Sequence, residues 1–309
     1  MTRQDFQKIL QKNHEDMLFI KQMEQSILSK RPYVFRIPKA GQPVILLLSG
    51  GIDSVVTWEK LLGEYHLHVY PVTASRGFFD PQQRAIRFFS AYFQQKYPAL
   101  YHQPVAIHAS LLDERLYGNL YKNYVSPKAM LQQYDVSFGY LKAPYSGTNA
   151  FTAILGAIHA QYLRLTKGVT IHTIIYGANA DDGLYISTQT YAFMRLMTRM
   201  LMVFVEDLKL QMGSVFYEAS LGAHAKKREV LKYGHDHHLP LSRTFSCARR
   251  GIWHCGTCPS CIGRQYCFSI NRIPDQTVYL HQLPLMVFTK KVVRRMKKLI
   301  PFEIFSHET

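Results

Sequence analysis

Residues 49–54 have the composition of a loop that binds phosphate. They read Ser-Gly-Gly-Ile-Asp-Ser and directly follow the apolar run 44–48. The two glycines permit a tight turn with positive φ and a close approach of the backbone to a ligand. Ser54 is placed to cap the helix that follows. Free N–H groups and the helix dipole would then point at one place, which favours a phosphate or a pyrophosphate. The alternative is an ordinary strand-to-helix turn that contains two glycines.

The cysteines form a second group with chemical potential. All five lie within a short stretch: Cys247, Cys255, Cys258, Cys261 and Cys267. Seven residues separate the first two, and two residues separate each of the next pairs, a spacing that suits a tetrahedral structural zinc site. An iron–sulfur cluster is the rival interpretation. His254 or Cys267 could replace one ligand of the zinc set.

The elements that must position these groups alternate along the chain. Strands are predicted at 44–48, 67–74, 105–109, 170–176 and 214–217, and helices at 54–63, 81–97, 149–166, 189–209 and 225–233. This alternation predicts an α/β fold, a doubly wound, Rossmann-like parallel sheet of five strands with helices on both faces. Ligands of such sheets bind beyond the carboxyl ends of the strands, where the strand order reverses.

Composition limits the classes of partner. The 309 residues are 47% hydrophobic, and 37 Lys and Arg against 21 Asp and Glu leave a formal charge of +16, which attracts polyanions. Part of the excess is local, in Lys290, Lys291, Arg294, Arg295, Lys297 and Lys298. This segment predicts a basic amphipathic helix, either a solvated face or a contact for a protein or nucleic acid. With no long apolar stretch and no signal-like N-terminus, we expect a cytoplasmic protein without a membrane span.

The glycine loop resembles the pyrophosphate loop of the N-type ATP pyrophosphatases, whose pattern is Ser-Gly-Gly-x-Asp-Ser. It matches neither the Walker A pattern nor the dinucleotide pattern. The resemblance implies a fold like that of the adenine nucleotide α-hydrolases, a loop that grips the β,γ-phosphates of ATP, and transfer of AMP to a substrate oxygen. The ATP-binding set carried over by position is Ser49, Gly50, Gly51, Asp53 and Ser54.

The loop together with the cysteines resembles the 7-cyano-7-deazaguanine synthase family of the queuosine pathway. That family ends in Ser-Cys, a spacer, Cys-Gly-x-Cys-x-x-Cys and an arginine. The corresponding residues are Ser246-Cys247, Cys255 to Cys261, and Arg264. The resemblance covers roughly residues 44 to 268. It implies zinc bound by Cys247, Cys255, Cys258 and Cys261.

Three further stretches match that family between the two motifs. They are Gly147-Thr148-Asn149, Gly177-Ala-Asn179-Ala-Asp181-Asp182, and Lys227-Arg-Glu-Val230. The resemblance implies that Asn149 joins the ATP-binding set, that Asn179 and Asp182 bind substrate, and that Lys227 acts with Asp53 and Ser54 in catalysis. Asp181 or Asp182 would position the base or a metal, with a surface acidic pair as the alternative.

Two departures weaken the match in the substrate region. The family's arginine before the asparagine is Thr148, and its Pro-Asp-Cys-Arg stretch, expected to help hold the base, aligns with Ser187–Thr190. ATP handling and zinc binding therefore look retained, and substrate recognition looks altered. The chain is interpreted as a divergent member.

The expected organisation has four parts. Residues 1–43 form an N-terminal helical extension, 44–240 the ATP-binding α/β domain, 241–270 the zinc-binding module, and 271–309 a basic C-terminal extension. Residues 111–147 are irregular and rich in Tyr and Lys, so an insertion or a lid is expected there.

The implied activity is an ATP-dependent carbon–nitrogen ligase that uses ATP, Mg²⁺ and Zn²⁺. It would adenylate a carboxylate such as 7-carboxy-7-deazaguanine and convert it with ammonia to the amide and the nitrile. Three alternatives stay open: a repurposed relative in a defence system that conjugates the activated deazapurine to a protein or nucleic-acid amine, a tRNA-modifying ATPase with the same loop, and a non-catalytic nucleotide-binding protein. A homodimer is one arrangement that the sequence leaves open.

Overall fold

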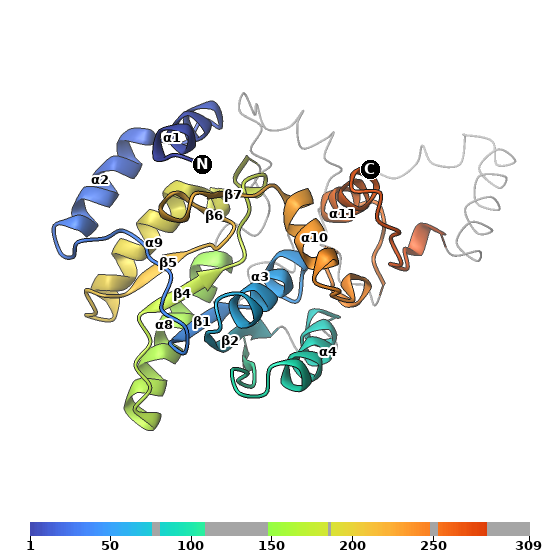
Figure 1. Cartoon of the computed structure of the whole chain (residues 1–309), viewed down its shortest axis with the longest axis horizontal. Helices are drawn as coiled ribbons and strands as arrows, with labels where there is room; N and C mark the ends of the chain where they lie inside the picture. Colours follow the sequence, from blue (N-terminus) through green and yellow to red (C-terminus); the bar gives the residue numbers. More distant parts are fainter. Residues whose placement is uncertain (76–80, 109–147, 185–186, 248–252, 283–309) are drawn as a thin grey trace, which may run out of the picture.

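The computed structural model describes residues 1–75, 81–108, 148–184, 187–247 and 253–282 (Figure 1). The predicted lid at 111–147 and the predicted basic helix near the C-terminus lie outside the described residues. None of the helices within the described ranges combines the length and the apolar character needed to cross a bilayer.

A sheet of five parallel strands forms the centre of the molecule. The strands are β1 (Pro43–Leu47), β2 (His68–Ser75), β3 (Val105–His108), β4 (Thr173–Tyr176) and β5 (Gln211–Gly213). Their order is β3-β2-β1-β4-β5, and every neighbouring pair is parallel. This is the predicted doubly wound fold. The strand order reverses between β1 and β4, so a ligand site is expected beyond the carboxyl ends of these two strands.

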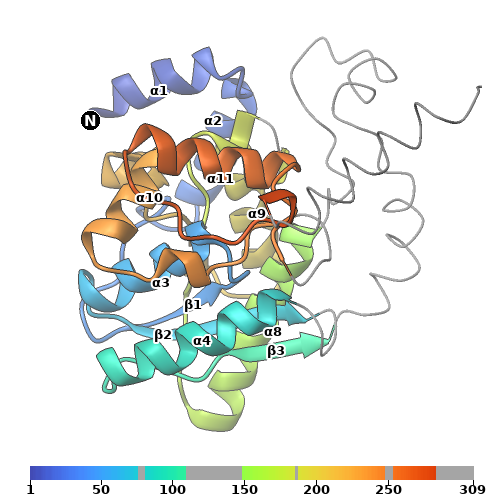
Figure 2. The ribbon, with the colours of Figure 1, turned by 90° about the vertical axis from the view of Figure 1, so that its right-hand side faces the viewer.

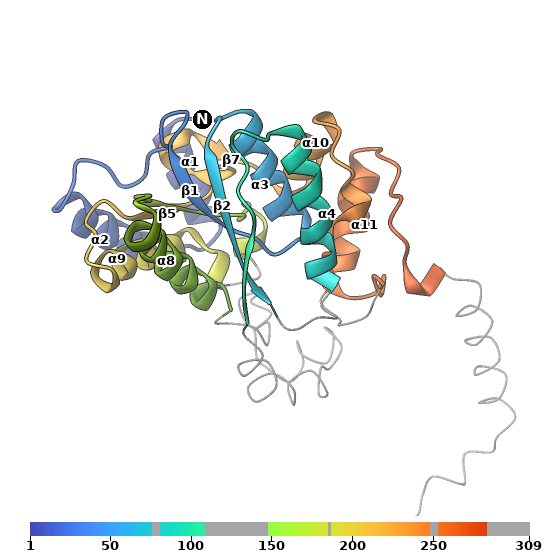
Figure 3. The same ribbon diagram turned by 90° about the horizontal axis from the view of Figure 1, so that it is seen from below.

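Helices cover both faces of the sheet (Figure 3). One face carries α8 (Thr148–Lys167) and α9 (Tyr191–Phe204), and the other carries α3 (Ile52–Gly63) and α4 (Pro81–Lys96). Beyond α3 lie α10 (Lys227–Asp236), which packs on α3, and α11 (Pro259–Ile270), which packs on α10 (Figure 2). A two-stranded antiparallel ribbon, β6 (Tyr217–Glu218) and β7 (Ala223–His224), precedes α10.

The first strand shows why the sequence forms a buried sheet. Val44 and Leu46 belong to the apolar core on the α3 face, whereas Ile45 and Leu47 belong to the core on the α8 face. Successive side chains of a strand point to opposite faces, and both faces are covered by helices. A continuous apolar run, instead of an alternating one, is therefore what this strand requires.

The predicted N-terminal helical extension contains two helices. They are α1 (Arg3–Lys12) and α2 (Met17–Leu28), separated by a turn in which His14 takes a φ of +56°. The extension docks on α9 through charged groups. The Glu15 carboxylate accepts hydrogen bonds from the N–H groups of Tyr191 and Ala192 at 2.7 and 3.1 Å, and the buried Arg195 pairs with Glu24 at 3.1 Å.

Two predicted elements differ most from the structure. The fifth strand was expected at 214–217, but β5 ends at Gly213, and Ser214 turns the chain away by donating its hydroxyl to the carbonyl of Ala178 at 2.6 Å. The apolar residues after it are buried beyond the sheet, and burial alone does not distinguish them from a strand. The helix expected at 189–209 ends at Phe204, because Glu206 takes a φ of +53° that a helix cannot include.

Candidate nucleotide site and metal centre

The glycine loop connects β1 to α3 with the geometry that its glycines permit. Gly50 has a φ of +75°, and a Cβ at this position would lie 2.8 Å from the carbonyl oxygen of Gln82. Glycine is therefore required at position 50 both by conformation and by space. Gly51 is the N-cap residue of α3, and no side chain caps this helix start. An uncapped helix N-terminus offers N–H groups to an anion.

Ser54 does not cap the helix as predicted. The helix begins two residues earlier, at Ile52, so Ser54 lies in its first turn. Its hydroxyl donates to the carbonyl of Gly51 at 3.1 Å, accepts from the N–H of Ser49 at 3.2 Å, and lies 3.0 Å from the Ser49 hydroxyl. The two serines therefore hold the loop together through hydrogen bonds within it. The N-cap residue is Gly51, which has no side chain.

Four predicted site residues meet beyond the carboxyl ends of β1 and β4. We call Asp53, Asn179, Asp182 and Lys227 the acid–lysine cluster. The Lys227 Nζ lies 3.1 Å from Asp53 Oδ2 and 3.1 Å from Asp182 Oδ1. The buried Asn179 donates its amide to Asp53 Oδ1 at 3.0 Å and to Asp182 Oδ2 at 2.7 Å. One cation and one amide thus hold two carboxylates together, at the point where the strand order reverses.

The surroundings set the charges of this cluster. Burial raises the pKa of Asp53, and the Asp182 carboxylate raises it further, against the opposing effects of Lys227 and Asn179. Burial alone would lower the pKa of Lys227, but the carboxylates of Asp182 and Asp53 outweigh it and raise that pKa above its ordinary value. Lys227 is therefore a cation at neutral pH, held between two acids beside the helix N-terminus.

The segment after β4 is fitted closely to the loop. A Cβ on Gly177 would lie 2.9 Å from both the Cα and the N of Ser54, so the two segments touch through their backbones. The side-chain Oδ1 of Asn179 accepts from the N–H groups of Asp181 and Asp182 at 3.0 and 3.2 Å. The Asp181 carboxylate accepts from the N–H of Lys227 at 3.0 Å. Asp181 therefore orders the start of α10, and Asp182 is the acid that enters the cluster.

Asn149 is not joined to the acid–lysine cluster by the hydrogen bonds of the described residues. It lies at the start of α8 and donates to the Thr188 hydroxyl at 3.0 Å. Thr188 belongs to 187–190, the stretch that the resemblance aligns with the Pro-Asp-Cys-Arg of the synthases. Its carbonyl also accepts from the Tyr176 hydroxyl at 3.4 Å. Asn149 therefore supports the divergent segment, and its expected role in ATP binding stays a prediction.

Four cysteines converge on one point. The Sγ atoms of Cys247, Cys255, Cys258 and Cys261 all lie within 4.8 Å of one another, with Cys247–Cys258 and Cys255–Cys261 at 4.0 Å. A tetrahedron with Zn–S bonds of about 2.3 Å has edges of about 3.8 Å, so the thiols fit a single metal ion. All five cysteines are free thiols.

The two substitute ligands considered from the sequence lie outside this group. Cys267 is buried in the apolar core on the α3 face. The Nε2 of His254 accepts a hydrogen bond from the N–H of Ser246 at 3.1 Å, which occupies this nitrogen. The candidate metal-binding set is therefore the four thiols, with Cys258 as the N-cap residue of α11, where the helix dipole favours a thiolate.

One contact between the metal centre and the loop was not predicted. The N–H of Phe245, two residues before Cys247, donates to the carbonyl of Gly50 at 2.8 Å. No local sequence pattern predicts this contact, because Phe245 and Gly50 are far apart in the sequence. The only available signal was the fixed Ser246-Cys247 pair that precedes the cysteine spacing.

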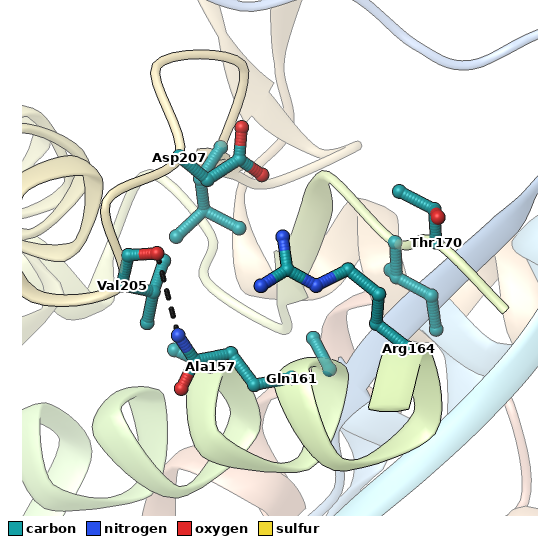
Figure 4. A pocket seen from close by; sticks show the side chains of 9 residues that line it. Ala157, Gln161, Arg164, Thr170, Val205 and Asp207 are labelled. Carbon is teal, nitrogen blue, oxygen red and sulfur yellow. Dashed lines mark hydrogen bonds between the residues drawn. The ribbon is translucent and has the colours of Figure 1, made fainter. Parts of the chain in front are cut away.

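A small recess lies at the other end of the sheet and is not part of this site. It is lined from α8 and from the segments that precede β4 and β5, with Arg164 and Asp207 on opposite walls and Gln161 donating to the carbonyl of Val205 (Figure 4). Its residues adjoin the amino ends of the strands. In open parallel sheets, ligands bind at the carboxyl ends.

Comparison with known proteins agrees with the motifs. The family model of the queuosine biosynthesis protein QueC matches residues 151–272, which include the acid–lysine residues after β4 and all the cysteines. The 7-cyano-7-deazaguanine synthase of Methanothermobacter thermautotrophicus is 25% identical over 242 residues, which cover 76% of this chain and 98% of that protein.

Other matches are shorter or weaker. The synthase of Methanothrix thermoacetophila is 29% identical over 133 residues, 43% of this chain and 55% of that protein. The synthase of Paracoccus denitrificans is 38% identical over 56 residues, 18% of this chain and 24% of that protein. Among solved structures, the U34-tRNA thiolase NcsA from Methanococcus maripaludis with its [4Fe-4S] cluster matches with a TM-score of 0.34 and 14% identity, over 93% of this chain and 81% of that one. This last similarity is too low to carry an argument. The sequence matches and the two motifs agree in showing similarity between this chain and the 7-cyano-7-deazaguanine synthases.

Proposed function

We propose that this protein is an ATP-dependent ligase that activates the carboxylate of a deazapurine acid, such as 7-carboxy-7-deazaguanine, and converts it with ammonia to the amide and then the nitrile. The observation that carries the proposal is the uncapped start of α3 beside the acid–lysine cluster. This arrangement combines N–H donors for phosphate with a cation that can balance a leaving pyrophosphate.

The proposed placement of ATP follows from the loop. Its β,γ-phosphates would lie at Ser49–Ser54, next to the first turn of α3. With ATP bound, the ammonium group of Lys227 would interact with the phosphates as well as with the two carboxylates. Asp53 and Asp182 provide carboxylate oxygens of the type that Mg²⁺ prefers, and Mg²⁺ would add positive charge to the departing pyrophosphate.

The proposed chemistry needs no covalent protein nucleophile. A carboxylate oxygen of the substrate attacks the α-phosphorus of ATP, and the bond to pyrophosphate breaks. Ammonia then attacks the acyl carbon and AMP leaves, which gives the amide. A second ATP adenylates the amide oxygen with release of a second pyrophosphate, and loss of AMP with two protons then gives the nitrile. The protein would bind, orient and balance charge at each step.

We propose that zinc occupies the cysteine centre and that its role is structural. Four thiolates complete a tetrahedron and leave no position for water or substrate. The close spacing of the four sulfurs favours one ion over a cluster in which each cysteine would bind a different iron. Free thiols also suit a reducing, cytoplasmic location. Metal analysis should find about one zinc per chain, and iron with sulfide would refute this assignment.

A second candidate function is transfer of the activated deazapurine to an amine of a protein or nucleic acid, as in a repurposed relative of a defence system. It is favoured by the altered stretch 187–190, which Asn149 and Tyr176 hold in place through Thr188. A tRNA-modifying ATPase is the third candidate, supported by the formal charge of +16. Salt-sensitive copurification of tRNA would favour it.

Product analysis separates these candidates. The purified, metal-loaded protein is incubated with 7-carboxy-7-deazaguanine, Mg²⁺-ATP and ammonium, and the base is followed by mass spectrometry. The proposed ligase should form the amide and then the nitrile, with release of AMP. Consumption of ATP to AMP without amide or nitrile, and with a mass increase on an added protein or RNA, would favour the conjugating relative instead.

A further inference from the structure

The segment 244–246 joins the metal centre to the glycine loop. Phe245 donates its N–H to the carbonyl of Gly50, and a Cβ on Gly51 would lie 3.7 Å from the carbonyl oxygen of Phe245 and 4.0 Å from the Ser246 hydroxyl. The next residue is the metal ligand Cys247. The back of the loop therefore rests on a segment whose far end is fixed at the cysteine centre.

A buried arginine holds this segment from the other side. Arg264 has no exposed surface. Its Nη1 donates to the Thr244 hydroxyl at 2.7 Å and to the Ser246 hydroxyl at 3.3 Å, and its Nη2 donates to the carbonyl of Leu241 at 2.7 Å. Its Nε donates to the Thr277 hydroxyl at 3.0 Å. The fork of the guanidinium thus fixes 241–246 in one conformation.

Arg264 lies on the helix that supplies two of the thiols. Cys258 is the N-cap residue of α11, Cys261 lies in its first turn, and Arg264 follows Cys261 by three residues, on the same side of the helix. The segment 244–246 is therefore held at both ends by one rigid element, through Cys247 and the metal at one end and through Arg264 at the other.

The guanidinium is costly to bury where it stands. Burial lowers the pKa of Arg264 against the opposing effects of Tyr279 and Asp275, and among the ion pairs of the described residues none includes this arginine. Hydrogen bonds from a charged guanidinium are strong and directional, so the forked geometry gives positional precision. Because segment 244–246 contacts the glycine loop, precise positioning of this segment also fixes the position of the loop.

We propose that Arg264 is a positioning residue, which together with the metal centre holds segment 244–246 as the support of the glycine loop and so sets the affinity of the loop for pyrophosphate. Arg264 itself contacts neither the loop nor its ligand through the hydrogen bonds described above. The proposal takes only the identity of the loop's ligand from the proposed function.

The test compares Arg264→Met with Arg31→Met in the full-length, zinc-loaded protein. Arg31 is a matched control, because it is also buried and also donates several hydrogen bonds to neutral oxygens, the main-chain carbonyls of Tyr33, Val34 and Leu210, at a site unrelated to the loop. Both variants should be less stable. Only Arg264→Met should weaken the binding of inorganic pyrophosphate with Mg²⁺, by about tenfold, the equivalent of one charge-assisted hydrogen bond.

Hydrogen–deuterium exchange gives a second readout that needs no nucleotide. Peptides covering 49–54 should exchange faster in Arg264→Met and in wild-type protein treated with a chelator, and the two changes together should add little beyond either alone, because they act on one segment. Thr244→Val keeps the side-chain volume and should weaken pyrophosphate binding by about threefold. This variant replaces Arg264→Met in the test if Arg264→Met does not fold.

Two results would overturn the inference. One is a folded Arg264→Met protein, with its zinc retained, in which loop exchange and pyrophosphate affinity equal those of wild type. The other is an equal loss of affinity in Arg31→Met, which would assign the effect to general destabilisation. Failure of the wild-type protein to bind pyrophosphate would instead contradict the proposed function, and the exchange comparison would still decide the role of Arg264.

Discussion

Lys227→Met should expose how far the acid–lysine cluster depends on its one cation. The substitution removes Nζ contacts of 3.1 Å to Asp53 and of 3.1 and 3.4 Å to Asp182, and leaves two carboxylates bound to the single amide of Asn179. Breaking a fully buried ion pair costs about 3–5 kcal/mol. The side chains here are 16–25% exposed, so we expect a loss of about 2–3 kcal/mol at neutral pH.

The loss of stability caused by Lys227→Met should depend on pH. Without Lys227, the pKa of Asp53, already raised by burial, should rise further. A carboxyl group whose pKa is higher in the folded state favours folding at low pH, and this contribution is lost as the pH rises through the folded pKa. The stability deficit of Lys227→Met relative to wild type should therefore be smaller at about pH 5 than at about pH 8, as one of the two acids becomes protonated.

Urea unfolding at both pH values measures the effect, and two further variants control it. Lys232→Met removes another lysine of α10, whose pair with Asp236 is solvent-exposed on both sides, and should leave the free energy of unfolding almost unchanged. Adding Asp182→Asn to Lys227→Met should recover part of the lost stability, because one unbalanced charge is removed. A deficit that does not change with pH and is not relieved by Asp182→Asn would refute the electrostatic account.

Three further predictions test other parts of the site. Gly177→Ala should destabilise the fold by about 1–3 kcal/mol and weaken ATP binding, because the new Cβ would lie 2.9 Å from the backbone of Ser54. The control Gly263→Ala, in an open position of α11, should be neutral or stabilising. Equal melting temperatures for the two variants would contradict the close fit at Gly177. Cys258→Ser should lower the bound zinc well below one per chain, and an unchanged metal content would exclude Cys258 as a ligand. Asn179→Leu should cost about 2–3 kcal/mol, because Asp53 and Asp182 lose their shared donor, and unfolding curves equal to wild type would argue against this role.

The parts of the fold that were predicted correctly are those encoded by short patterns. The apolar run at 44–48 and the glycines after it contain both the strand and the turn, so β1 and the positive φ of Gly50 follow from a few neighbouring residues. The cysteine spacing is equally local, and the structure brings the same four thiols together. The alternation of strands and helices then leaves few topologies for a parallel sheet.

The features that escaped prediction depend on distant contacts. Ser54 satisfies the rule for an N-cap, but the helix begins at Ile52, and the Ser54 hydroxyl bonds to Ser49 and Gly51 instead of capping it. The contact of Phe245 with Gly50 joins segments far apart in the chain. Asp53 and Lys227 were each assigned a role, yet their ion pair follows only from the placement of α10 beside α3. These roles, and the division of the chain into four parts, stay predictions.

The most direct test of the central claim is exchange of labelled pyrophosphate into ATP. The assay reports reversible adenylation alone, whatever amine receives the acyl group afterwards. The account predicts exchange that requires 7-carboxy-7-deazaguanine and Mg²⁺, is abolished or strongly reduced by Lys227→Met and Gly177→Ala, and persists in Lys232→Met. Absence of exchange with this acid, in folded protein that carries its zinc, would contradict it.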